Sequence, residues 1–358
     1  MVVGHSCVFS WSYSVKSCPP GHQWDRYRFR VSSGLRNADL VTAPTSWMLQ
    51  QLRRHYGPFM TMGAIYNGRS LAMPDEPKKE FVFASGRLWD TAKNFSLLDE
   101  VARDVPWPIY VAGDPSNIDG TTVQFKDLRL LGHLSKTSLP NWLARAPIFA
   151  LPVRYEPFGL GALEAGLAQC ALVLGDTPSL REVWDSAALF VSPDNPDELR
   201  SCIKTLIDKP DLRVEMGKKS RDRALKFSST SMGRKYWETY SYLWSIEKTT
   251  RDFCARIPVS VETRVSSPPA LKTRPDAKLT IALFYHSLVS DWNNGNAHFL
   301  RGIATELCGR GHTVRIYEPR GGWSMSNLLV NEGPAPVEVS LNWPSAVGGG
   351  RTRWFCPR

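Results

Sequence analysis

Short apolar runs alternate with longer amphipathic stretches along most of the chain, which is the pattern of parallel strands separated by helices. The alternation is regular from residue 81 onward. The predicted strands are 81–85, 109–113, one within 123–131, 148–153, 171–174 and 188–191. The predicted helices are 94–103, 138–146, 159–168, 180–184, 196–208 and 211–227. We therefore predict an α/β fold whose centre is a Rossmann-like, doubly wound parallel sheet, with ligands bound at the carboxyl ends of the strands.

The first 75 residues show a related but less regular pattern. Strands are predicted at 1–6, 38–44 and 64–68, and helices at 24–35 and 47–56. Thr45 is a suitable cap for the second of these helices. Because the chain opens within a predicted strand, we expect this first lobe to be incomplete. A joint rich in Pro and charge, Pro74 to Lys79, separates it from the regular part.

The pattern changes again after a predicted aromatic helix at 232–246. Residues 256–278 contain four Pro and no periodicity, which is typical of a linker. A strand at 279–285, a helix at 297–308 and a strand at 313–317 then predict the start of another Rossmann-like domain, followed by a Gly- and Arg-rich tail at 344–358. The predicted segments are 1–75, 76–250, 251–277 and 278–358.

The overall composition is that of a globular protein with an excess of basic residues. Hydrophobic residues make up 42%, and 44 Lys and Arg against 34 Asp and Glu give a net charge of +10. The basic residues are dispersed, which argues against a nucleic-acid partner but suits a phosphorylated substrate or peripheral contact with an acidic membrane. Seven scattered Cys without a Cys-x-x-Cys pair indicate a reducing compartment. The same Cys spacing leads us to expect no bound metal. Neither a membrane-spanning run nor a signal-peptide pattern is apparent, so we expect a cytoplasmic protein.

Two cations follow the predicted strand 81–85. Arg87, in Gly86-Arg87-Leu88, and Lys93 would lie at the carboxyl end of this strand. Arg binds phosphate oxygens through two parallel hydrogen bonds and Lys adds a compact positive charge, so this pair suits a diphosphate. The alternative is that both are ordinary surface cations.

A second cluster follows the buried strand 148–153. Glu156 precedes a turn at Gly159, and Glu164 lies one to two turns into the next predicted helix. Glycine at such a turn lets backbone amides approach an anion at the helix N-terminus, and Glu164 would face a ribose diol. In a third segment, Leu131-Gly132-His133-Leu134, backbone groups would bind a base edge, although His133 is equally compatible with a surface position.

These motifs together resemble the retaining glycosyltransferases of the GT-B type, the group 1 family that includes glycogen and sucrose synthases. The resemblance covers about residues 1–250, and its most specific part is the Glu-x7-Glu motif from Glu156 to Glu164. Further matching segments are Gly86-Arg87-Leu88 with Lys93, Leu131 to Leu134, Ser179-Leu180-Arg181-Glu182-Val183, Asn67-Gly68, and Gly4-His5-Ser6.

The resemblance implies a role for each of these positions. Arg87 and Lys93 would neutralise the donor diphosphate, and Glu156 would contact the donor sugar near its 3- and 4-hydroxyls. Glu164 would bind the ribose hydroxyls. The remaining roles are backbone contacts to phosphate and sugar at Phe158, Gly159 and Leu160, base contacts at His133 and Leu134, and orientation of the sugar or acceptor by His5.

The function implied is transfer of a hexose-type sugar from a nucleoside diphosphate sugar to an acceptor hydroxyl, with retained anomeric configuration. The donor is a co-substrate, no cofactor is expected, and the acceptor is a carbohydrate, a lipid or a small molecule. Two alternatives stay open: a catalytically impaired nucleotide-sugar-binding fragment, and a sugar-nucleotide epimerase of similar fold. A phosphorylase with pyridoxal phosphate is disfavoured because no Lys lies between Glu156 and Glu164.

The chain also departs from the family pattern. Residues 166–173 replace the usual Gly-Pro-Val-Val, and the segment after Lys278 resembles the opening of another glycosyltransferase-like protein. This suggests a truncated gene joined to a neighbour, an incorrect gene model, or a circular permutation. We expect residues 251–358 to be dispensable for donor binding. Because the acceptor lobe is represented by residues 1 to about 70, we expect donor binding with weak or absent transfer.

Overall fold

The computed structural model describes residues 1–117, 120–135, 137–256, 280–284, 303–304 and 306–317. The chain divides into two compact units, and the first runs from Met1 to Ser229 while the second begins at Thr230. The first unit therefore contains the predicted segment 1–75 as well as most of 76–250.

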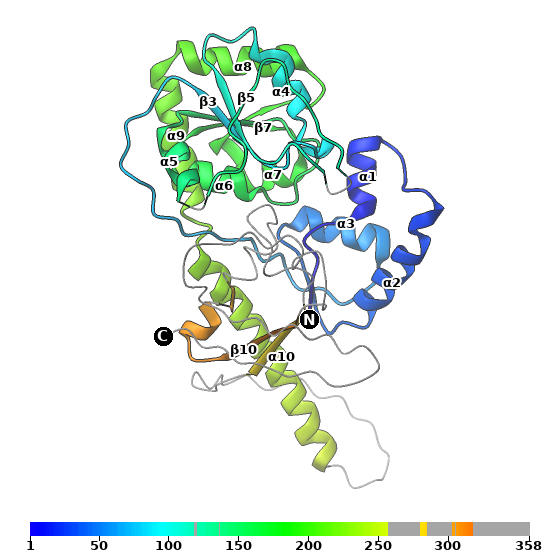
Figure 1. Cartoon of the computed structure of the whole chain (residues 1–358). Coiled ribbons are helices and arrows are strands. Elements are labelled where there is room, and N and C mark those ends of the chain that lie inside the picture. The colour runs from blue at the N-terminus through cyan, green and yellow to red at the C-terminus, as the bar shows by residue number, and fades with distance from the viewer. Residues whose placement is uncertain (118–119, 136, 257–279, 285–302, 305, 318–358) are drawn as a thin grey trace. The chain divides into compact units, whose positions relative to one another are not determined.

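A six-stranded parallel sheet forms the centre of the first unit, with helices on both faces (Figure 1). Its strands are β3 (Val82–Ser85), β4 (Ile109–Ala112), β5 (Arg129–Leu130), β6 (Ile148–Leu151), β7 (Ala171–Gly175) and β8 (Leu189–Val191). Its helices are α4 (Phe95–Ala102), α5 (Ser138–Arg145), α6 (Leu160–Leu167), α7 (Pro178–Trp184), α8 (Pro196–Asp208) and α9 (Pro210–Ala224), with 3₁₀ turns η2 (Thr91–Lys93) and η3 (Asp185–Ala187). The predicted α/β fold with a doubly wound parallel sheet is confirmed.

The burial of the strands agrees with their positions in the sheet. The order is β5-β4-β3-β6-β7-β8, so β4, β3, β6 and β7 lie in the interior of the sheet. Every residue of β6 and β7 is buried, as expected for parallel strands covered on both faces. The less apolar β5, with both residues exposed, lies at one edge.

Residues 1–56 form a smaller layer with its own core. Its elements are β1 (Val2–Val3), α1 (Val8–Lys16), η1 (His22–Trp24), α2 (Asp25–Arg36), β2 (Val41–Thr42) and α3 (Ser46–Tyr56). β1 pairs with β2 in parallel, and Val41 also bridges to Thr61. Buried residues from the three α-helices and from β2, including Phe9, Val41 and Leu52, form the core of this layer.

One element of this region was not predicted and one prediction was wrong. Helix α1 had no counterpart among the predicted elements; the Cys7 side chain caps it by accepting from the Ser10 amide at 3.3 Å. Residues 64–68 form no strand, although the Ile65 amide donates to the Ala43 carbonyl at 3.0 Å.

The second unit contains α10, which runs from Ser229 to Arg256, and the parallel pair β9 (Thr280–Phe284) and β10 (Thr313–Tyr317). Helical residues at 303–304 and 306–309 precede β10. Helix α10 is longer than the predicted 232–246, so the first six residues of the predicted linker are helical. The rest of that linker, most of the predicted helix 297–308 and the tail 344–358 lie outside the described residues. None of the described helices has the length and apolar character needed to cross a membrane.

Candidate active site

The strand order has a switch point beside β3, where a crevice is expected. The chain passes from β3 to β4 on one side and returns to β6 on the other side of β3. Connections that leave two adjacent parallel strands in opposite directions open a binding crevice at the carboxyl ends of those strands. Arg87 and Lys93 follow β3, and Glu156 follows β6, so the fold brings together motifs that are far apart in the sequence.

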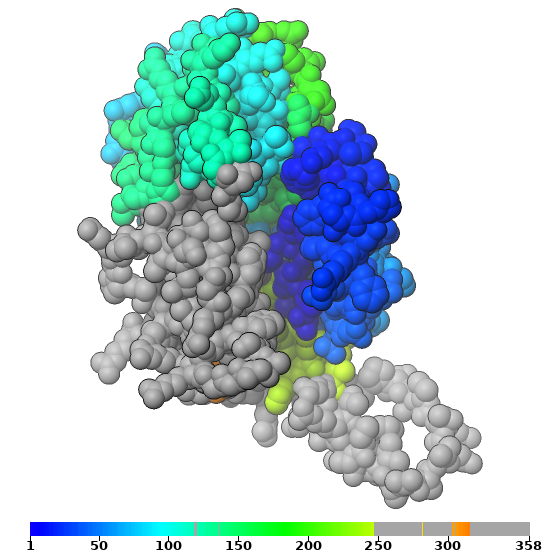
Figure 2. Space-filling view, turned by 45° about the vertical axis from the view of Figure 1, so that its right-hand side comes forward, coloured from blue at the N-terminus to red at the C-terminus, as the bar shows by residue number. Residues whose placement is uncertain are grey.

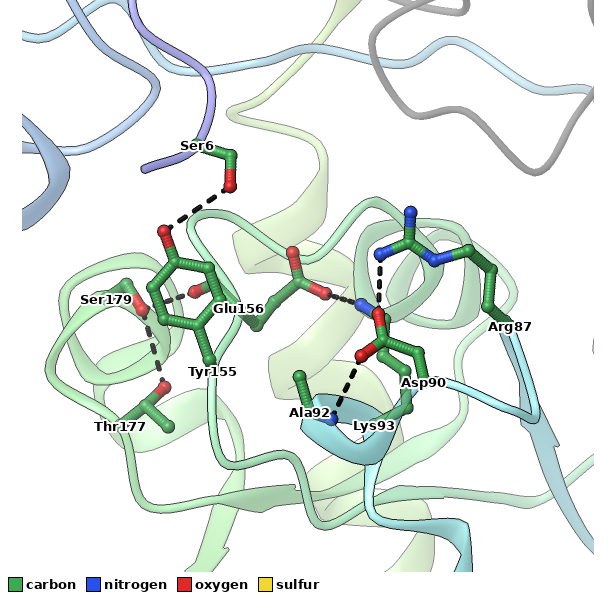
Figure 3. Close-up of polar contacts among 9 residues, drawn as sticks. All are labelled: Ser6, Arg87, Asp90, Ala92, Lys93, Tyr155, Glu156, Thr177 and Ser179. Carbon is green, nitrogen blue, oxygen red and sulfur yellow. Dashed lines mark hydrogen bonds and ion pairs between the residues drawn. The ribbon is translucent and has the colours of Figure 1, made fainter. Parts of the chain in front are cut away.

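Lys93 and Glu156 form an ion pair in this crevice (Figure 3). Both side chains are largely buried, with 16% of Lys93 and 15% of Glu156 exposed. The next residue, Asn94, holds the two connections together, because its side-chain amide donates to the carbonyls of Pro152 at 3.0 Å and Pro193 at 2.8 Å. The backbone that carries Lys93 is therefore fixed to the segments after β6 and β8.

Arg87 has a carboxylate partner of its own. Its Nη2 lies 2.6 Å from Oδ2 of Asp90, whose other oxygen accepts from the Ala92 amide at 3.0 Å and caps η2 (Figure 3). The Arg87 side chain is 42% exposed, so a ligand can reach it. These two cations and two carboxylates sum to zero charge. Within the described residues, no three His, Cys, Asp or Glu side chains are grouped as a metal site.

The turn before α6 has the geometry that the sequence predicted. Gly159 has φ +91°, a left-handed conformation that favours glycine, and α6 begins at the next residue. Phe158 is buried and contacts the Phe227 ring edge-on, with 5.8 Å between the ring centroids, and Leu160 packs against the core. Their side chains are thus structural, which leaves backbone amides for contact with an anion.

Glu164 is paired with a residue that sequence reasoning missed. Its Oε1 lies 2.8 Å from Nε of Arg69, and the two side chains are 12% and 25% exposed. Burial raises the pKa of the Glu164 carboxyl, and the Arg69 guanidinium opposes this shift. Arg69 belongs to the stretch between α3 and β3, and its amide donates to the Phe227 carbonyl at 2.9 Å.

His5 lies two residues after β1 on a segment attached to the loop that carries Glu156. The Cys7 amide donates to the Tyr155 hydroxyl at 3.2 Å. Figure 3 shows the second contact, in which the Ser6 hydroxyl lies 3.5 Å from the same Tyr155 oxygen. Burial lowers the pKa of His5 to about 4, so its imidazole is neutral at neutral pH. A neutral ring can both donate and accept a hydrogen bond.

The loops after β3, β4 and β5 are in direct contact. The Gly113 amide donates to the Gly132 carbonyl at 2.9 Å, and a Cβ added at Gly113 would lie 1.8 Å from the Gly86 carbonyl oxygen. This contact places the predicted base-binding loop beside the Arg87 loop. Within it, His133 is exposed and Leu134 packs partly against the core.

Sequence comparison identifies the part of the chain that contains this crevice. Residues 73–223 match the family described as Glycosyl transferases group 1. These residues form a group 1 glycosyltransferase domain. The resemblance to this family in the sequence motifs is thereby confirmed.

Curated relatives of the glycosyltransferase domain include glycogen synthase from Mycobacterium tuberculosis, which is 35% identical over 97 residues, or 26% of this chain and 23% of that protein. Alpha-D-kanosaminyltransferase from Streptomyces kanamyceticus is 22% identical over 217 residues, or 60% of this chain and 53% of that protein. The chain thus spans about a quarter of the first relative and about half of the second.

Solved structures share the fold at low sequence identity. Sucrose-phosphate synthase from Thermosynechococcus elongatus aligns with a TM-score of 0.59 at 19% identity, over 68% of each chain. The Anabaena protein HepE, in complex with UDP and glucose, aligns with a TM-score of 0.53 at 18% identity, over 61% of this chain and 67% of that chain. These similarities place the fold in the GT-B class.

The glycosyltransferase domain is bonded to the N-terminal layer through contacts that sequence reasoning did not predict. The carboxylate of Glu182 accepts from the backbone amides of Ser46 at 2.7 Å and Trp47 at 2.9 Å, and from the Tyr66 hydroxyl at 2.9 Å. Thr45, predicted as a helix cap, also donates to the Pro157 carbonyl at 3.0 Å. Figure 2 shows the N-terminal layer, in blue, against the domain.

Proposed function

We propose that the protein transfers a hexose-type sugar from a nucleoside diphosphate sugar to an acceptor hydroxyl, with retention of the anomeric configuration. The observation that carries this proposal is the Lys93–Glu156 ion pair, with Arg87 nearby, at the switch point of the sheet and before the uncapped first turn of α6. A cation, a carboxylate and free helix amides in one crevice suit a ligand that joins a diphosphate to a polyhydroxyl group.

The diphosphate would replace the carboxylates as the partner of both cations. When its oxygens bind Lys93 and Arg87, the carboxylate of Glu156 is released to accept hydrogen bonds from sugar hydroxyls. The backbone amides from Phe158 to Leu160 would hold a phosphate, and Glu164, oriented by Arg69, would accept from the ribose hydroxyls. His133 and Leu134 would contact the base.

In the chemical step, the bond between the anomeric carbon and the diphosphate oxygen breaks, and the acceptor oxygen bonds to the same carbon. The acceptor hydroxyl loses its proton, which the departing diphosphate can take up when the acceptor approaches on the same face. Lys93 and Arg87 stabilise the charge that develops on the diphosphate. The neutral His5 imidazole would orient a hydroxyl by hydrogen bonding.

We further propose that this step needs no metal cofactor, because the two fixed cations supply the charge that a divalent ion would otherwise provide. Turnover with excess EDTA should then equal turnover with Mg²⁺. The acceptor class, whether carbohydrate, lipid or small molecule, is part of the same proposal, as are a cytoplasmic location and the absence of a nucleic-acid partner.

Donor binding tests the proposal directly. Substituting Lys93→Met removes one charge-assisted contact and should weaken binding of UDP-glucose or GDP-mannose by about 2 kcal/mol, roughly 30-fold, in isothermal calorimetry. Lys126→Met is the matched control, because this exposed lysine lies before β5, the edge strand of the sheet, and forms no ion pair among the described residues.

The product distinguishes the proposed transfer from its alternatives. NMR of the product should show a new glycoside with the anomeric configuration of the donor. Epimerised nucleotide sugar formed without acceptor would establish an epimerase instead, and donor binding without any product would establish a binding fragment. Equal donor affinity of the parent chain and the Lys93→Met variant would reject the proposed site.

A further inference from the structure

A groove lies between α2 and the last turn of α3, remote from the donor crevice. It encloses about 620 Å³, and its lining includes residues of both helices. Helix α3 begins at Ser46, next to Glu182, and its 11 residues place its last turn about 16 Å farther along the helix axis. The groove is therefore separate from the site that contains Lys93 and Glu156.

The charge of the groove is strongly positive. Arg28, Arg36 and Arg54 line it, against the carboxylate of Asp25. Asp25 already accepts from Nδ1 of His22 at 3.1 Å. Arg36 and Arg54 form no ion pair with any residue that the structure describes. Their charges thus remain available to an anion, unlike those of Arg87 and Lys93.

A buried imidazole adds a second, independent indication of a ligand. His55 lines the groove with 9% of its surface exposed, and its Nε2 has no hydrogen-bond partner among the described residues. Its ring is stacked on the Tyr13 ring, with 5.5 Å between the ring centroids, and this stacking fixes the orientation of the imidazole. Burial, Arg54 and Arg28 lower the pKa of His55, so the ring is neutral at neutral pH. A buried polar atom without a protein partner is rare and calls for an explanation, and a group bound in the groove would provide one.

The remaining lining selects among anions. Ser32 and Ser33 bring hydroxyl donors, and the exposed ring of Phe29 brings an apolar surface at the same place. Guanidinium groups donate and cannot accept, so several of them together match an anion with many acceptor oxygens. A phosphate group provides more acceptor oxygens and more charge than a carboxylate.

We propose that this groove binds a phosphate-bearing ligand, whose oxygens are held by Arg28, Arg36 and Arg54 and whose apolar part lies on Phe29. The phosphate belongs either to a soluble phosphoester or to the headgroup of an anionic lipid. Both sources share the same contacts.

Inorganic phosphate is the first probe, titrated into the full chain by calorimetry. The double variant Arg36→Ala with Arg54→Ala should weaken its binding at least about tenfold, the scale of one or two charge-assisted contacts. The matched control is Arg26→Ala with Arg30→Ala, which removes two exposed charges from α2 that do not line the groove. Both double variants should melt at the temperature of the parent chain, because the substituted side chains are exposed.

Vesicles then distinguish the two sources. If the ligand is a lipid headgroup, the groove variant loses co-sedimentation with phosphatidylglycerol–phosphatidylcholine vesicles and the control variant keeps it. If the ligand is soluble, the groove variant loses phosphate binding alone. Equal losses in the two double variants would show unspecific charge attraction and overturn the proposal. Loss of phosphate binding in Lys93→Met but not in the groove variant would place the bound phosphate in the donor crevice and overturn it as well.

Discussion

The charged side chains of the proposed donor site each have an opposite charge as partner. Lys93 is paired with Glu156, Arg87 with Asp90, and Glu164 with Arg69. Each partner compensates a partly buried charge, and an uncompensated buried charge would destabilise the folded protein. Under the proposed function, a donor diphosphate would have to compete with these carboxylates, and its affinity would depend on this exchange of partners.

His5 predicts a pH dependence of stability. Its pKa is about 4 in the folded protein, against 6.5 for an exposed imidazole. Between these values the unfolded chain binds a proton that the folded chain does not, so stability falls as the pH drops from 6.5 toward 4. The loss should amount to about 1–3 kcal/mol, and His5→Asn should remove it, as measured by urea unfolding at pH 7 and pH 4.5.

His22→Asn is the control for this measurement, because the His22 side chain is fully exposed. It should leave the pH dependence of the parent chain unchanged. A His5→Asn variant that loses as much stability on acidification as the parent chain would show that His5 is not the responsible group.

At the scale of the elements, helix α3 depends on a cap from elsewhere in the chain. Thr45 accepts from the Met48 amide at 3.1 Å, and the Glu182 carboxylate on α7 accepts from the two amides before it. A negative charge at a helix N-terminus is favourable both as a hydrogen-bond acceptor and through the helix dipole. The N-terminal layer is therefore attached to the domain through a helix end.

Glu182→Ala should destabilise the protein by about 1–2 kcal/mol in urea unfolding, the cost of a lost helix cap. Glu182→Gln should recover part of this, since its amide oxygen can still accept. Glu215→Ala, which removes an exposed i,i+4 partner of Lys219, should cost markedly less. Equal losses for Glu182→Ala and Glu215→Ala would show that the contact with α3 contributes nothing.

Gly113 is the closest contact between the loops after β3 and β4. Gly113→Ala would place a Cβ 1.8 Å from the Gly86 carbonyl oxygen, at φ +150°. We expect a loss of at least about 2 kcal/mol in thermal or urea unfolding, with weaker donor binding because Gly86 precedes Arg87. Gly34→Ala in α2, where a Cβ meets no atom within 4 Å, should instead stabilise by about 0.5–1 kcal/mol. Unchanged stability of Gly113→Ala would contradict the tight contact.

At the scale of the whole molecule, the hydrophobic pattern predicted the sheet well, because its interior strands are short continuous runs of buried apolar residues. All six strands of the sheet and its main helices lie where the pattern predicted them. The layer formed by residues 1–56 was less predictable. In α1 the serines Ser10 and Ser12 are buried, at 2% and 3% exposure, so polar residues occupy the inner face and the amphipathic signal is lost.

The positions of the candidate site residues were predictable, but the partners of those residues were not. The motifs indicated Arg87, Lys93, Glu156 and Glu164, because turns after buried strands of a parallel sheet share one edge. Asp90 lies close to Arg87 in the sequence, whereas the pairing of Arg69 with Glu164 depends on how the stretch after α3 crosses the domain. Such contacts are set by tertiary structure and leave no local pattern.

The attachment of α3 to Glu182 has a consequence for the order of synthesis. Ser46 and Glu182 are separated by 136 residues, and Ser10 and its partner Tyr155 by 145. At a translation rate of 5–20 residues per second, the Glu182 carboxylate is synthesised roughly 7–27 s after the Ser46 amide that it caps. The N-terminal layer, though made first, therefore completes its packing only as the loop with Glu156 and helix α7 leave the ribosome.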